Sequence, residues 1–212
     1  MIDFPEMTSA HVAGAKLFAN RHDMIAALPI PPAPVVAEVG VALGEFSKYL
    51  VETLRPAQFH AFDLFQIHRD EMLWGRPTRE VLGGQTHADF YRNAMSGTGI
   101  LMHEGPSAET LKHLPDQYLD LAYIDAQHTY EGVLEDAREC ARAAKEGGIL
   151  VFNDYILHDP FIHADYGVVP VVNQMVVNEG WRVIGFALQK HLFCDIALQR
   201  ATSAHSSGPL HL

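Results

Sequence analysis

The chain has 212 residues, of which 48% are apolar and 19% charged, and this length suits one α/β domain better than two domains of ordinary size. Its 15 Lys and Arg against 26 Asp and Glu give a formal charge of −11, so a nucleic-acid backbone is an unsuitable partner. No apolar run approaches the roughly 20 residues that span a bilayer, and residues 1–5 lack the basic start of a signal peptide. We therefore expect a cytoplasmic protein with no membrane partner.

The N-terminal segment has apolar side chains at helical spacing. Residues 8–28 predict a helix that Thr8 or Ser9 caps and Pro29 ends. This helix forms an N-terminal extension, residues 1–33, of a single domain that reaches residue 200. The small, polar tail over residues 201–212 is expected to be disordered.

From Pro34 onward, short apolar runs alternate with longer amphipathic segments. The apolar runs predict strands at 35–39, 59–62, 99–103, 119–124 and 149–152. The segments between them predict helices at 44–54, 87–95, 108–114 and 130–146, the last ended by two glycines. Strands that are apolar throughout and separated by helices are typical of a parallel sheet covered on both faces.

The C-terminal end of the chain departs from this alternation. After a helix at about 169–178, two strand-like runs, 181–188 and 192–198, are joined by residues 189–191 alone. Such a short connection cannot make a parallel crossover, so the two strands must pair antiparallel. The sequence therefore predicts an α/β fold: a doubly wound, mostly parallel seven-stranded sheet with helices on both faces and an antiparallel C-terminal hairpin.

A glycine-containing turn follows the first predicted strand. Gly40 and Gly44 allow the backbone to turn tightly and to approach a ligand, and the helix that follows presents free N–H groups. A dinucleotide-binding loop would place its third glycine at position 45, where Glu45 stands. A carboxylate there disfavours the pyrophosphate of a nicotinamide cofactor. A glycine turn without a ligand is the alternative interpretation.

Four carboxylates, Glu38, Asp63, Asp125 and Asp154, fall at the carboxyl ends of predicted strands. Asp63 follows Gly44 by 19 residues, near the spacing at which such folds place a carboxylate on ribose hydroxyls. Since strand carboxyl ends form the ligand crevice of an open parallel sheet, these acids are expected to converge, and their repulsion favours a bound organic or metal cation. A role as helix N-cap is the alternative for Asp125.

Taken together, these motifs resemble those of class I S-adenosylmethionine-dependent methyltransferases, from residue 34 to about 199. The terminal hairpin also agrees with the last two strands of that family's Rossmann-like fold. The matching segments are E-V-G-V-A-L-G at 38–44, F-D at 62–63, Y-I-D-A-Q-H-T-Y-E at 123–131 and G-G-I-L-V-F-N-D-Y at 147–155. The resemblance implies an enzyme that uses S-adenosylmethionine as its methyl donor.

The resemblance also implies which residues contact this cofactor. Glu38, Gly40 and Gly44 would flank its methionine part, Asp63 would hold its ribose, and residues near Ser107 would approach its adenine. Asp125 and its neighbours would then face the reacting centre, where Asp125 is also a candidate catalytic residue. The full expected set is Glu38, Gly40, Val41, Ala42, Gly44, Ser47, Asp63, Leu64, Ser107, Asp125, Ala126 and Gln127.

Within the family, the I-D-x-x-H-x-Y and N-D-Y segments are similar to small-molecule O-methyltransferases of the macrocin and catechol kinds. Some of these enzymes hold Mg²⁺ or another divalent cation between positions that correspond to Asp125, Asn153 and Asp154, and three oxygen ligands suit Mg²⁺. Macrocin-type enzymes carry a second acid two residues after the first, where this chain has Gln127. The resemblance therefore leaves a metal-dependent and a metal-free site both open.

The expected reaction is methyl transfer to a small-molecule acceptor at a hydroxyl oxygen, whose proton must leave. His128, three residues after Asp125, is the first candidate base and His158 the second. The alternative for His128 is a structural role, in which it hydrogen-bonds its own turn or caps the helix that begins near Tyr130. The irregular segments 66–86 and 155–168 are expected to contact the acceptor through Trp74, Arg76, Tyr155, Phe161 and Tyr166. A non-catalytic protein that binds S-adenosylmethionine or another nucleoside, and a nicotinamide-dependent reductase, are the competing functions. A homo-oligomer is compatible with the sequence.

Overall fold

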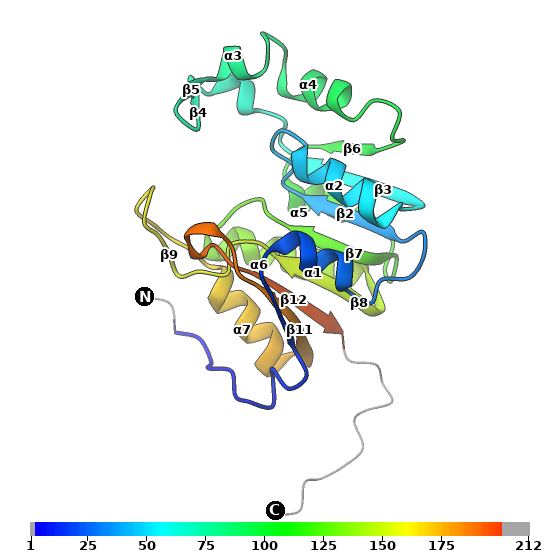
Figure 1. Cartoon of the computed structure of the whole chain (residues 1–212), viewed down its shortest axis with the longest axis vertical. Helices are drawn as coiled ribbons and strands as arrows, with labels where there is room; N and C mark the ends of the chain where they lie inside the picture. Colours follow the sequence, from blue (N-terminus) through cyan, green and yellow to red (C-terminus); the bar gives the residue numbers. More distant parts are fainter. Residues whose placement is uncertain (1–2, 201–212) are drawn as a thin grey trace, which may run out of the picture.

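The computed structural model describes residues 3–200, and at its centre is one eight-stranded sheet (Figure 1). Its strands are β1 (Lys16–Phe18), β2 (Val35–Val39), β3 (Gln58–Asp63), β6 (Leu101–Glu104), β7 (Leu119–Ile124), β8 (Ala144–Phe152), β11 (Trp181–Ala187) and β12 (Asp195–Arg200). They lie in the order β1-β11-β12-β8-β7-β2-β3-β6. β12 is antiparallel to both of its neighbours, and the other neighbours pair parallel. The predicted doubly wound sheet with its antiparallel C-terminal hairpin is confirmed, with eight strands in place of seven.

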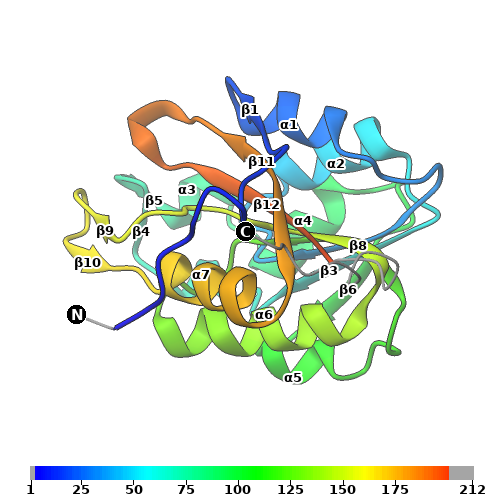
Figure 2. The ribbon, with the colours of Figure 1, turned by 90° about the horizontal axis from the view of Figure 1, so that it is seen from below.

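Helices cover both faces of this sheet (Figure 2). The helices are α1 (Arg21–Ala27), α2 (Glu45–Leu54), α3 (Thr78–Val81), α4 (His87–Ala94), α5 (Ser107–Leu111), α6 (Tyr130–Ala143) and α7 (Val168–Asn178). α1, α2 and α4 pack into one buried core, and α5, α6 and α7 pack into the other. Consecutive residues of a strand pack into opposite cores, as Val36 and Ala37 of β2 do. Because both faces of the sheet are buried, the strands are apolar throughout.

Two insertions follow the carboxyl ends of strands. Between β3 and α4 lie a 3₁₀ turn, the hairpin of β4 and β5, and α3; between β8 and α7 lies the hairpin of β9 and β10. Their bounds are Ile67–Arg69 for the turn, Met72–Leu73 for β4, Arg76–Pro77 for β5, His158–Asp159 for β9 and Ala164–Asp165 for β10, and a second 3₁₀ turn spans Lys190–Leu192. Within residues 3–200, no helix has the length and apolar character needed to cross a bilayer.

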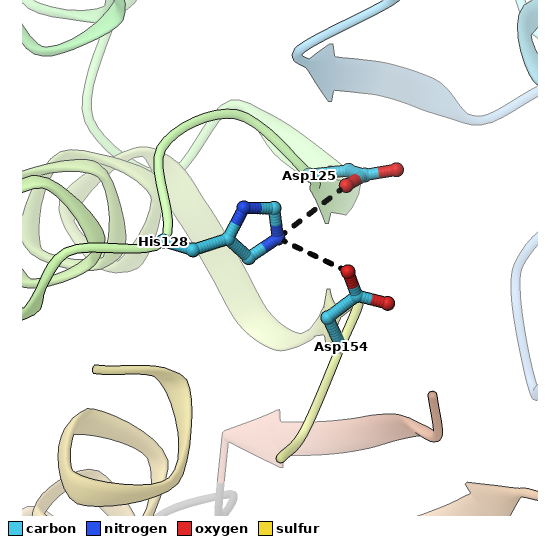
Figure 3. Close-up of side chains that lie close together, drawn as sticks. All are labelled: Asp125, His128 and Asp154. Atoms are coloured by element: carbon cyan, nitrogen blue, oxygen red, sulfur yellow. Dashed lines mark ion pairs between the residues drawn. The ribbon is translucent and has the colours of Figure 1, made fainter. Parts of the chain in front are cut away.

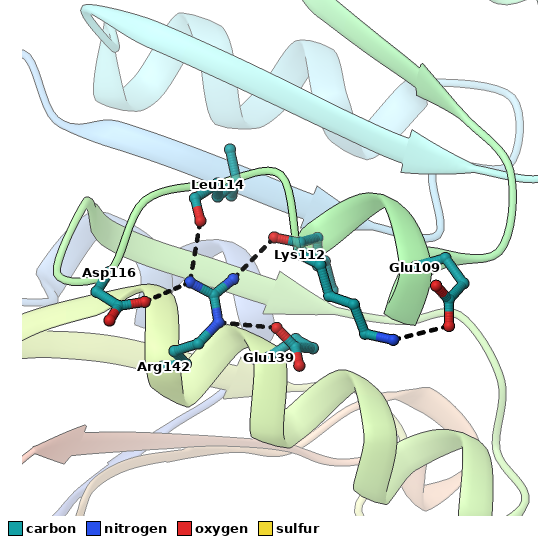
Figure 4. Close-up of polar contacts among 7 residues, drawn as sticks. Glu109, Lys112, Leu114, Asp116, Glu139 and Arg142 are labelled. Carbon is teal, nitrogen blue, oxygen red and sulfur yellow. Dashed lines mark hydrogen bonds and ion pairs between the residues drawn. The ribbon is translucent and has the colours of Figure 1, made fainter.

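Arg142, near the end of α6, joins this helix to α5 (Figure 4). Its guanidinium donates to the backbone oxygens of Leu111 and Leu114 at 3.0 and 2.9 Å and to the Asp116 carboxylate at 2.6 Å. Glu139, one turn earlier, accepts from Arg142 Nε at 2.8 Å. Because the last carbonyls of a helix lack partners within it, these bonds complete the end of α5 and hold it against α6.

The N-terminal helix predicted over residues 8–28 is wrong in its first part. Gly14 has φ +84°, outside the helical region, and residues 16–18 form β1, the eighth strand, which pairs parallel with β11. α1 begins only at Arg21, because the Asn20 side chain accepts from the backbone N–H of Asp23 and caps the helix there. The predicted disordered tail over residues 201–212 lies outside the described residues.

Two boundaries near the C-terminus also differ from the prediction. α6 ends at Ala143, and residues 144–146, predicted as helix, begin β8 instead. The pairing of β7 with β8 shifts register between Leu119 and Leu121, so Gly147 and Gly148 belong to a bulged strand rather than to a helix end. The last strand begins at Asp195 rather than at 192, because Leu192 has φ +66° and lies in an exposed turn.

A histidine pair formed by the buried His60 of β3 and the partly buried His103 of β6 gives a stability prediction. His60 Nδ1 and His103 Nε2 lie 2.9 Å apart, and burial, together with His103, lowers the pKa of His60 from 6.5 to about 4. As pH falls from 6.5 toward 4, the unfolded chain binds a proton at this position that the folded chain does not bind, so the free energy of unfolding decreases. We expect His60→Phe to reduce this decrease, measured by urea unfolding at pH 7 and pH 4.5. The same pH dependence in both proteins would contradict the prediction.

Candidate functional site

A pocket of about 480 Å³ opens where β2, β3, β6 and β7 end. Its walls come from the turns after these four strands and from the first turns of α6. Of the cofactor-binding residues expected from the sequence, the pocket is lined by Gly40, Ala42, Asp63, Leu64, Ser107, Asp125, Ala126 and Gln127. Glu38, Val41, Gly44 and Ser47 lie outside its lining. The volume falls within the range of about 300 to 1,000 Å³ that is usual for small-molecule sites.

Gly40 lies where the turn after β2 meets the turn after β7. A Cβ at this position would stand 2.1 Å from the backbone oxygen of Asp125, and φ is +85°, so only glycine fits. The amide of Asp125 also donates to the oxygen of Val39 at 2.7 Å. These two contacts set Asp125 directly beside the glycine turn, and Gly40 and Asp125 both line the pocket.

Asp63, at the end of β3, is held by backbone donors. Oδ2 accepts from the N–H of Val41 at 3.0 Å, and Oδ1 accepts from the N–H of Phe65 at 2.7 Å. Each carboxylate oxygen can accept a second hydrogen bond, and Asp63 lines the pocket. A ligand hydroxyl in the pocket would therefore find a carboxylate whose orientation is already set.

Glu38 lies behind the pocket wall rather than in it. Only 2% of its surface is exposed, and its Oε2 accepts from the Ser47 hydroxyl, which in turn accepts from the Tyr91 hydroxyl at 3.0 Å. Burial raises the pKa of Glu38 to about 8. Its expected contact with the cofactor stays a prediction, because the described geometry makes Glu38 part of a hydrogen-bonded core.

Asp136 is a pocket residue that the sequence analysis did not single out. It lines the pocket, its side chain is buried, and its Oδ1 accepts from the Ser107 hydroxyl at 2.6 Å. Burial raises the pKa of Asp136 to about 6. The sequence contained a signal for this residue: Asp136 lies on the same face of α6 as the buried Val133 and Cys140, and an acidic residue is unexpected on a buried face.

His128, Asp125 and Asp154 converge beyond the Asp125 end of the pocket (Figure 3). His128 Nε2 lies 3.7 Å from Asp125 Oδ1 and 3.5 Å from Asp154 Oδ2. Nε2 is buried and has no hydrogen-bond partner among the described residues. The Tyr166 ring stacks on the imidazole, with centroids 4.4 Å apart, and the N–H of Gly167 donates to the His128 backbone oxygen at 2.7 Å. The imidazole is thus held with a free nitrogen directed between two carboxylates.

The charges of this cluster are shifted toward neutrality. Burial, Asp154 and Asp195 raise the pKa of Asp125 well above its usual value, and burial raises the pKa of Asp154 to about 6. Burial lowers the pKa of His128, so its ring is neutral near pH 7. Asp154 also has φ +53°, a conformation that is uncommon outside glycine and that often marks functional sites.

Neither alternative helix-cap role is found at this turn. The N-cap of α6 is Thr129, whose hydroxyl accepts from the N–H of Gly132 at 3.3 Å. Asp125 and His128 therefore do not cap the helix, and their side chains face each other and Asp154 instead.

The cluster contains the ligand types of a divalent-metal site. One oxygen from each carboxylate and the His128 nitrogen lie within 4.8 Å of one another. An unpartnered buried imidazole nitrogen between two carboxylates fits a bound cation, and the added nitrogen favours Mn²⁺, Fe²⁺ or Zn²⁺ over Mg²⁺. The side-chain N–H of Asn153, expected as a ligand, donates a hydrogen bond to the Tyr123 hydroxyl oxygen at 3.1 Å, and its ligand role stays a prediction.

Other predicted residues lie on the two insertions. His158, the second candidate base, is half exposed, and its Nδ1 lies 2.8 Å from Asp165 on the same hairpin. Trp74 and Phe161 are exposed, whereas the Tyr155 hydroxyl donates to Asn173 at 2.6 Å within the protein. Of the expected acceptor residues, Tyr166 is the one placed directly against the cluster.

The partly buried Arg21 and the buried Asp195 belong to a hydrogen-bonded network that the sequence did not predict. Arg21, the first residue of α1, donates to the Tyr123 hydroxyl at 3.1 Å, and that hydroxyl donates to Asp195 at 2.7 Å. The network lies close enough to act on the cluster, because the Arg21 charge lowers the pKa of Asp154 against the larger effect of burial. No local sequence signal connects these residues, since Arg21 and Tyr123 are 102 positions apart.

Comparisons with known proteins identify the family and the fold of this chain. A family model described as a methyltransferase domain matches residues 37–155. A putative O-methyltransferase from Klebsiella pneumoniae is 18% identical over 81% of this chain and 74% of its own, with a TM-score of 0.57. A SAM-dependent methyltransferase from Aquifex aeolicus is 15% identical over 82% and 85% of the two chains, with a TM-score of 0.53.

A phosphoethanolamine N-methyltransferase from Haemonchus contortus, solved with phosphoethanolamine and S-adenosylhomocysteine, is 12% identical over 89% of this chain and 43% of its own, with a TM-score of 0.56. At such identities, likeness to a solved structure extends to the fold alone. No curated protein matches this chain in sequence.

The buried Glu38 leads to a prediction about pH and stability. Its pKa is about 8 in the folded protein against 4.5 when unfolded, so the folded state binds the proton more tightly. The resulting stabilisation is present below pH 4.5 and is lost as pH rises through 8. We expect Glu38→Gln, which stays neutral, to raise the free energy of unfolding relative to wild type at pH 9 more than at pH 5. Urea unfolding at the two pH values measures this, and an effect that is independent of pH would contradict it.

Proposed function

Because the chain belongs to the methyltransferase family whose domain model spans residues 37–155, it is an S-adenosylmethionine-dependent methyltransferase, and we propose that it methylates a hydroxyl oxygen of a small-molecule acceptor. One observation carries this proposal. The unpartnered nitrogen of His128 lies between Asp125 and Asp154, and Asp125 is shared between this cluster and the pocket. A group able to take up a hydroxyl proton thus adjoins the proposed cofactor site.

The proposed cofactor position follows from the chemistry of the pocket wall. Asp63 would accept hydrogen bonds from the ribose hydroxyls, Ser107 and its neighbours would face the adenine, and Asp125 would lie nearest the methionine end. The backbone bonds that hold Asp63 support this arrangement, because a carboxylate that is already oriented binds hydroxyls without further ordering.

The surrounding charge also suits this cofactor. The sulfonium is positive, and the carboxylates of Asp125 and Asp154 lie at the proposed reacting end of the site. Transfer of the methyl group is an in-line displacement in which the acceptor oxygen attacks carbon while the carbon–sulfur bond breaks. The protein mainly aligns the three atoms, and such positioning can contribute about 7 to 11 kcal/mol.

The acceptor proton would leave at the cluster. His128 is neutral near pH 7 because burial lowers its pKa, so its Nε2 can take the proton directly. Nε2 can instead bind a metal ion, but its single lone pair cannot do both at once. Asp125, Asp154 and His128 would hold the ion; Asn153 is the further ligand proposed from the sequence. When bound, such a cation lowers the pKa of an acceptor hydroxyl and orients it.

The proposed reaction is tested by incubating the protein with S-adenosylmethionine and matched sets of small hydroxyl, amine and thiol compounds, with mass spectrometry of the products. We expect a mass gain of one methyl group in hydroxyl compounds.

His128→Gln should leave the affinity for S-adenosylhomocysteine within about twofold of wild type and lower kcat by about 10²- to 10⁴-fold, the usual contribution of a positioned base. Asp125→Ala should lose cofactor binding, because this residue lines the pocket.

Each competing outcome has a definite meaning. Turnover at the wild-type rate in His128→Gln would remove His128 from the reaction. Cofactor binding without transfer to any acceptor would favour a non-catalytic binding protein. Methylation confined to amines would refute the hydroxyl assignment. Tight binding of NADH without binding of S-adenosylhomocysteine would refute the cofactor assignment.

Metal binding by the cluster is tested on protein first stripped with a chelator. We expect calorimetric titration to show binding of Mn²⁺ or Zn²⁺ that is tighter than binding of Mg²⁺, because one ligand is an imidazole. Asp154→Asn should weaken the binding of all three ions, whereas His128→Gln should weaken the binding of Zn²⁺ most. No binding by the wild type, together with full activity after exhaustive chelation, would exclude the metal and leave His128 as the base.

A further inference from the structure

His87 is a fully buried histidine that the proposed reaction does not use. It is the first residue of α4, and none of its surface is exposed. Its Nε2 lies 2.6 Å from the backbone oxygen of Ala42 in the glycine turn. Because a carbonyl oxygen can only accept, Nε2 must carry the proton and donate it. A segment inserted after β3 thereby contacts the turn after β2 through one directed hydrogen bond.

The bond from His87 reaches a residue with an unfavourable backbone conformation. Ala42 has φ +43°, in the left-handed region that residues with a Cβ rarely adopt, and Ala42 lines the pocket. Such a conformation persists only where neighbouring groups hold it. Gly40 and Gly44 are held by bonds to Phe62 O and Val41 O, both 2.8 Å, and among the described residues His87 is the donor that reaches the Ala42 oxygen.

The same imidazole adjoins the carboxylate proposed to hold the ribose. His87 Nδ1 is buried without a hydrogen-bond partner in the described structure and lies 3.8 Å from Asp63 Oδ1. Asp63 Oδ2, in turn, accepts from the N–H of Val41, the residue before Ala42. A change in the turn at Ala42 would therefore also release one of the bonds that orient Asp63.

The ring of His87 has little freedom to turn away from these partners. Its backbone N–H donates to His68 Nδ1 at 3.3 Å, and the Phe65 ring lies against its imidazole at 5.2 Å between centroids. The preceding residue, Thr86, caps α4 through its hydroxyl, which accepts from the N–H of Asp89. The position of the Nε2 donor is thus set by the start of α4.

We propose that His87 is a positioning residue for the cofactor: its Nε2–H holds Ala42 in the conformation that shapes the pocket wall and keeps Asp63 oriented before S-adenosylmethionine binds. The inference rests on the proposed placement of the cofactor in this pocket. Its physical basis is preorganisation, because a turn that is already ordered loses less conformational entropy on binding. His87 touches neither the cofactor nor the reacting atoms and acts through Ala42 and Asp63.

The test is calorimetric titration of S-adenosylhomocysteine into wild type, His87→Phe and His87→Gln. We expect His87→Phe to raise Kd about tenfold, equivalent to about 1.4 kcal/mol, because it keeps a ring but loses the donor. His87→Gln places an amide N–H within reach of the Ala42 oxygen and should return Kd to within about threefold of wild type. His87→Leu serves as the donor-free variant if His87→Phe does not fold.

His60→Phe is the matched control. His60 lies on β3, is buried like His87, and is not part of the pocket lining. It should lower stability without changing Kd for S-adenosylhomocysteine. A 2′-deoxy analogue of this ligand adds a second measurement: wild type should discriminate against it, and His87→Phe should discriminate less, because Asp63 is less well oriented.

Three results would overturn the proposal: wild-type affinity in His87→Phe, equal weakening in His87→Phe and His87→Gln, or equal weakening in His60→Phe. The second would show that ring volume matters rather than the donor, and the third that stability alone is responsible. Absence of binding in the wild type would instead refute the cofactor placement on which the inference rests. These failures are distinguishable because wild type is measured first.

Discussion

Backbone contact between the turn after β2 and the turn after β7 is the constraint on which the rest of the site depends. At Gly40 the two turns approach so closely that a Cβ would stand 2.1 Å from the Asp125 oxygen. This approach places the pocket wall and the Asp125 side chain side by side, so that the proposed cofactor site and the histidine cluster share one residue. A side chain at position 40 would separate them, and neither the pocket nor the cluster would keep its geometry.

Carboxylates dominate the interior around this contact. Glu38, Asp125, Asp154 and Asp195 all have raised pKa values, chiefly because burial disfavours their charged forms. The cation that acts on all four is Arg21, which comes from the N-terminal segment. A concentration of acids with so little compensation favours a positively charged ligand, and the sulfonium of S-adenosylmethionine meets that requirement. The same imbalance favours a divalent cation at Asp125 and Asp154.

The insertion between β3 and β6 contributes more to the proposed cofactor site than to acceptor contacts. Its helix α4 directs two buried polar side chains, His87 and Tyr91, toward the segment after β2. They stand four positions apart and therefore share one helix face. The hairpin of β4 and β5, by contrast, exposes Trp74, and the expected acceptor residue that lies against His128 is Tyr166, which follows β8.

Local pattern was sufficient to predict seven of the eight strands of the central sheet, most helices, the antiparallel hairpin and the strand-end acids. It failed for residues 8–20, where pairing with β11 outweighed helical spacing, and for residues 144–146, where pairing with β7 extended β8. These errors have one cause: whether an edge segment becomes helix or strand depends on a partner strand that is distant in sequence.

The sequence by itself determined the alternation of strands and helices. It also determined the shared edge at which Asp63, Asp125 and Asp154 meet, because the carboxyl ends of parallel strands lie at the same edge of a sheet irrespective of side-chain identity. Tertiary structure alone decided which groups face one another there. The His87 donor and the Ala42 oxygen are 45 positions apart, and Ser107 and Asp136 are 29 apart. Directed hydrogen bonds require sub-ångström placement, and only the packing of α4 and α6 against the sheet supplies it.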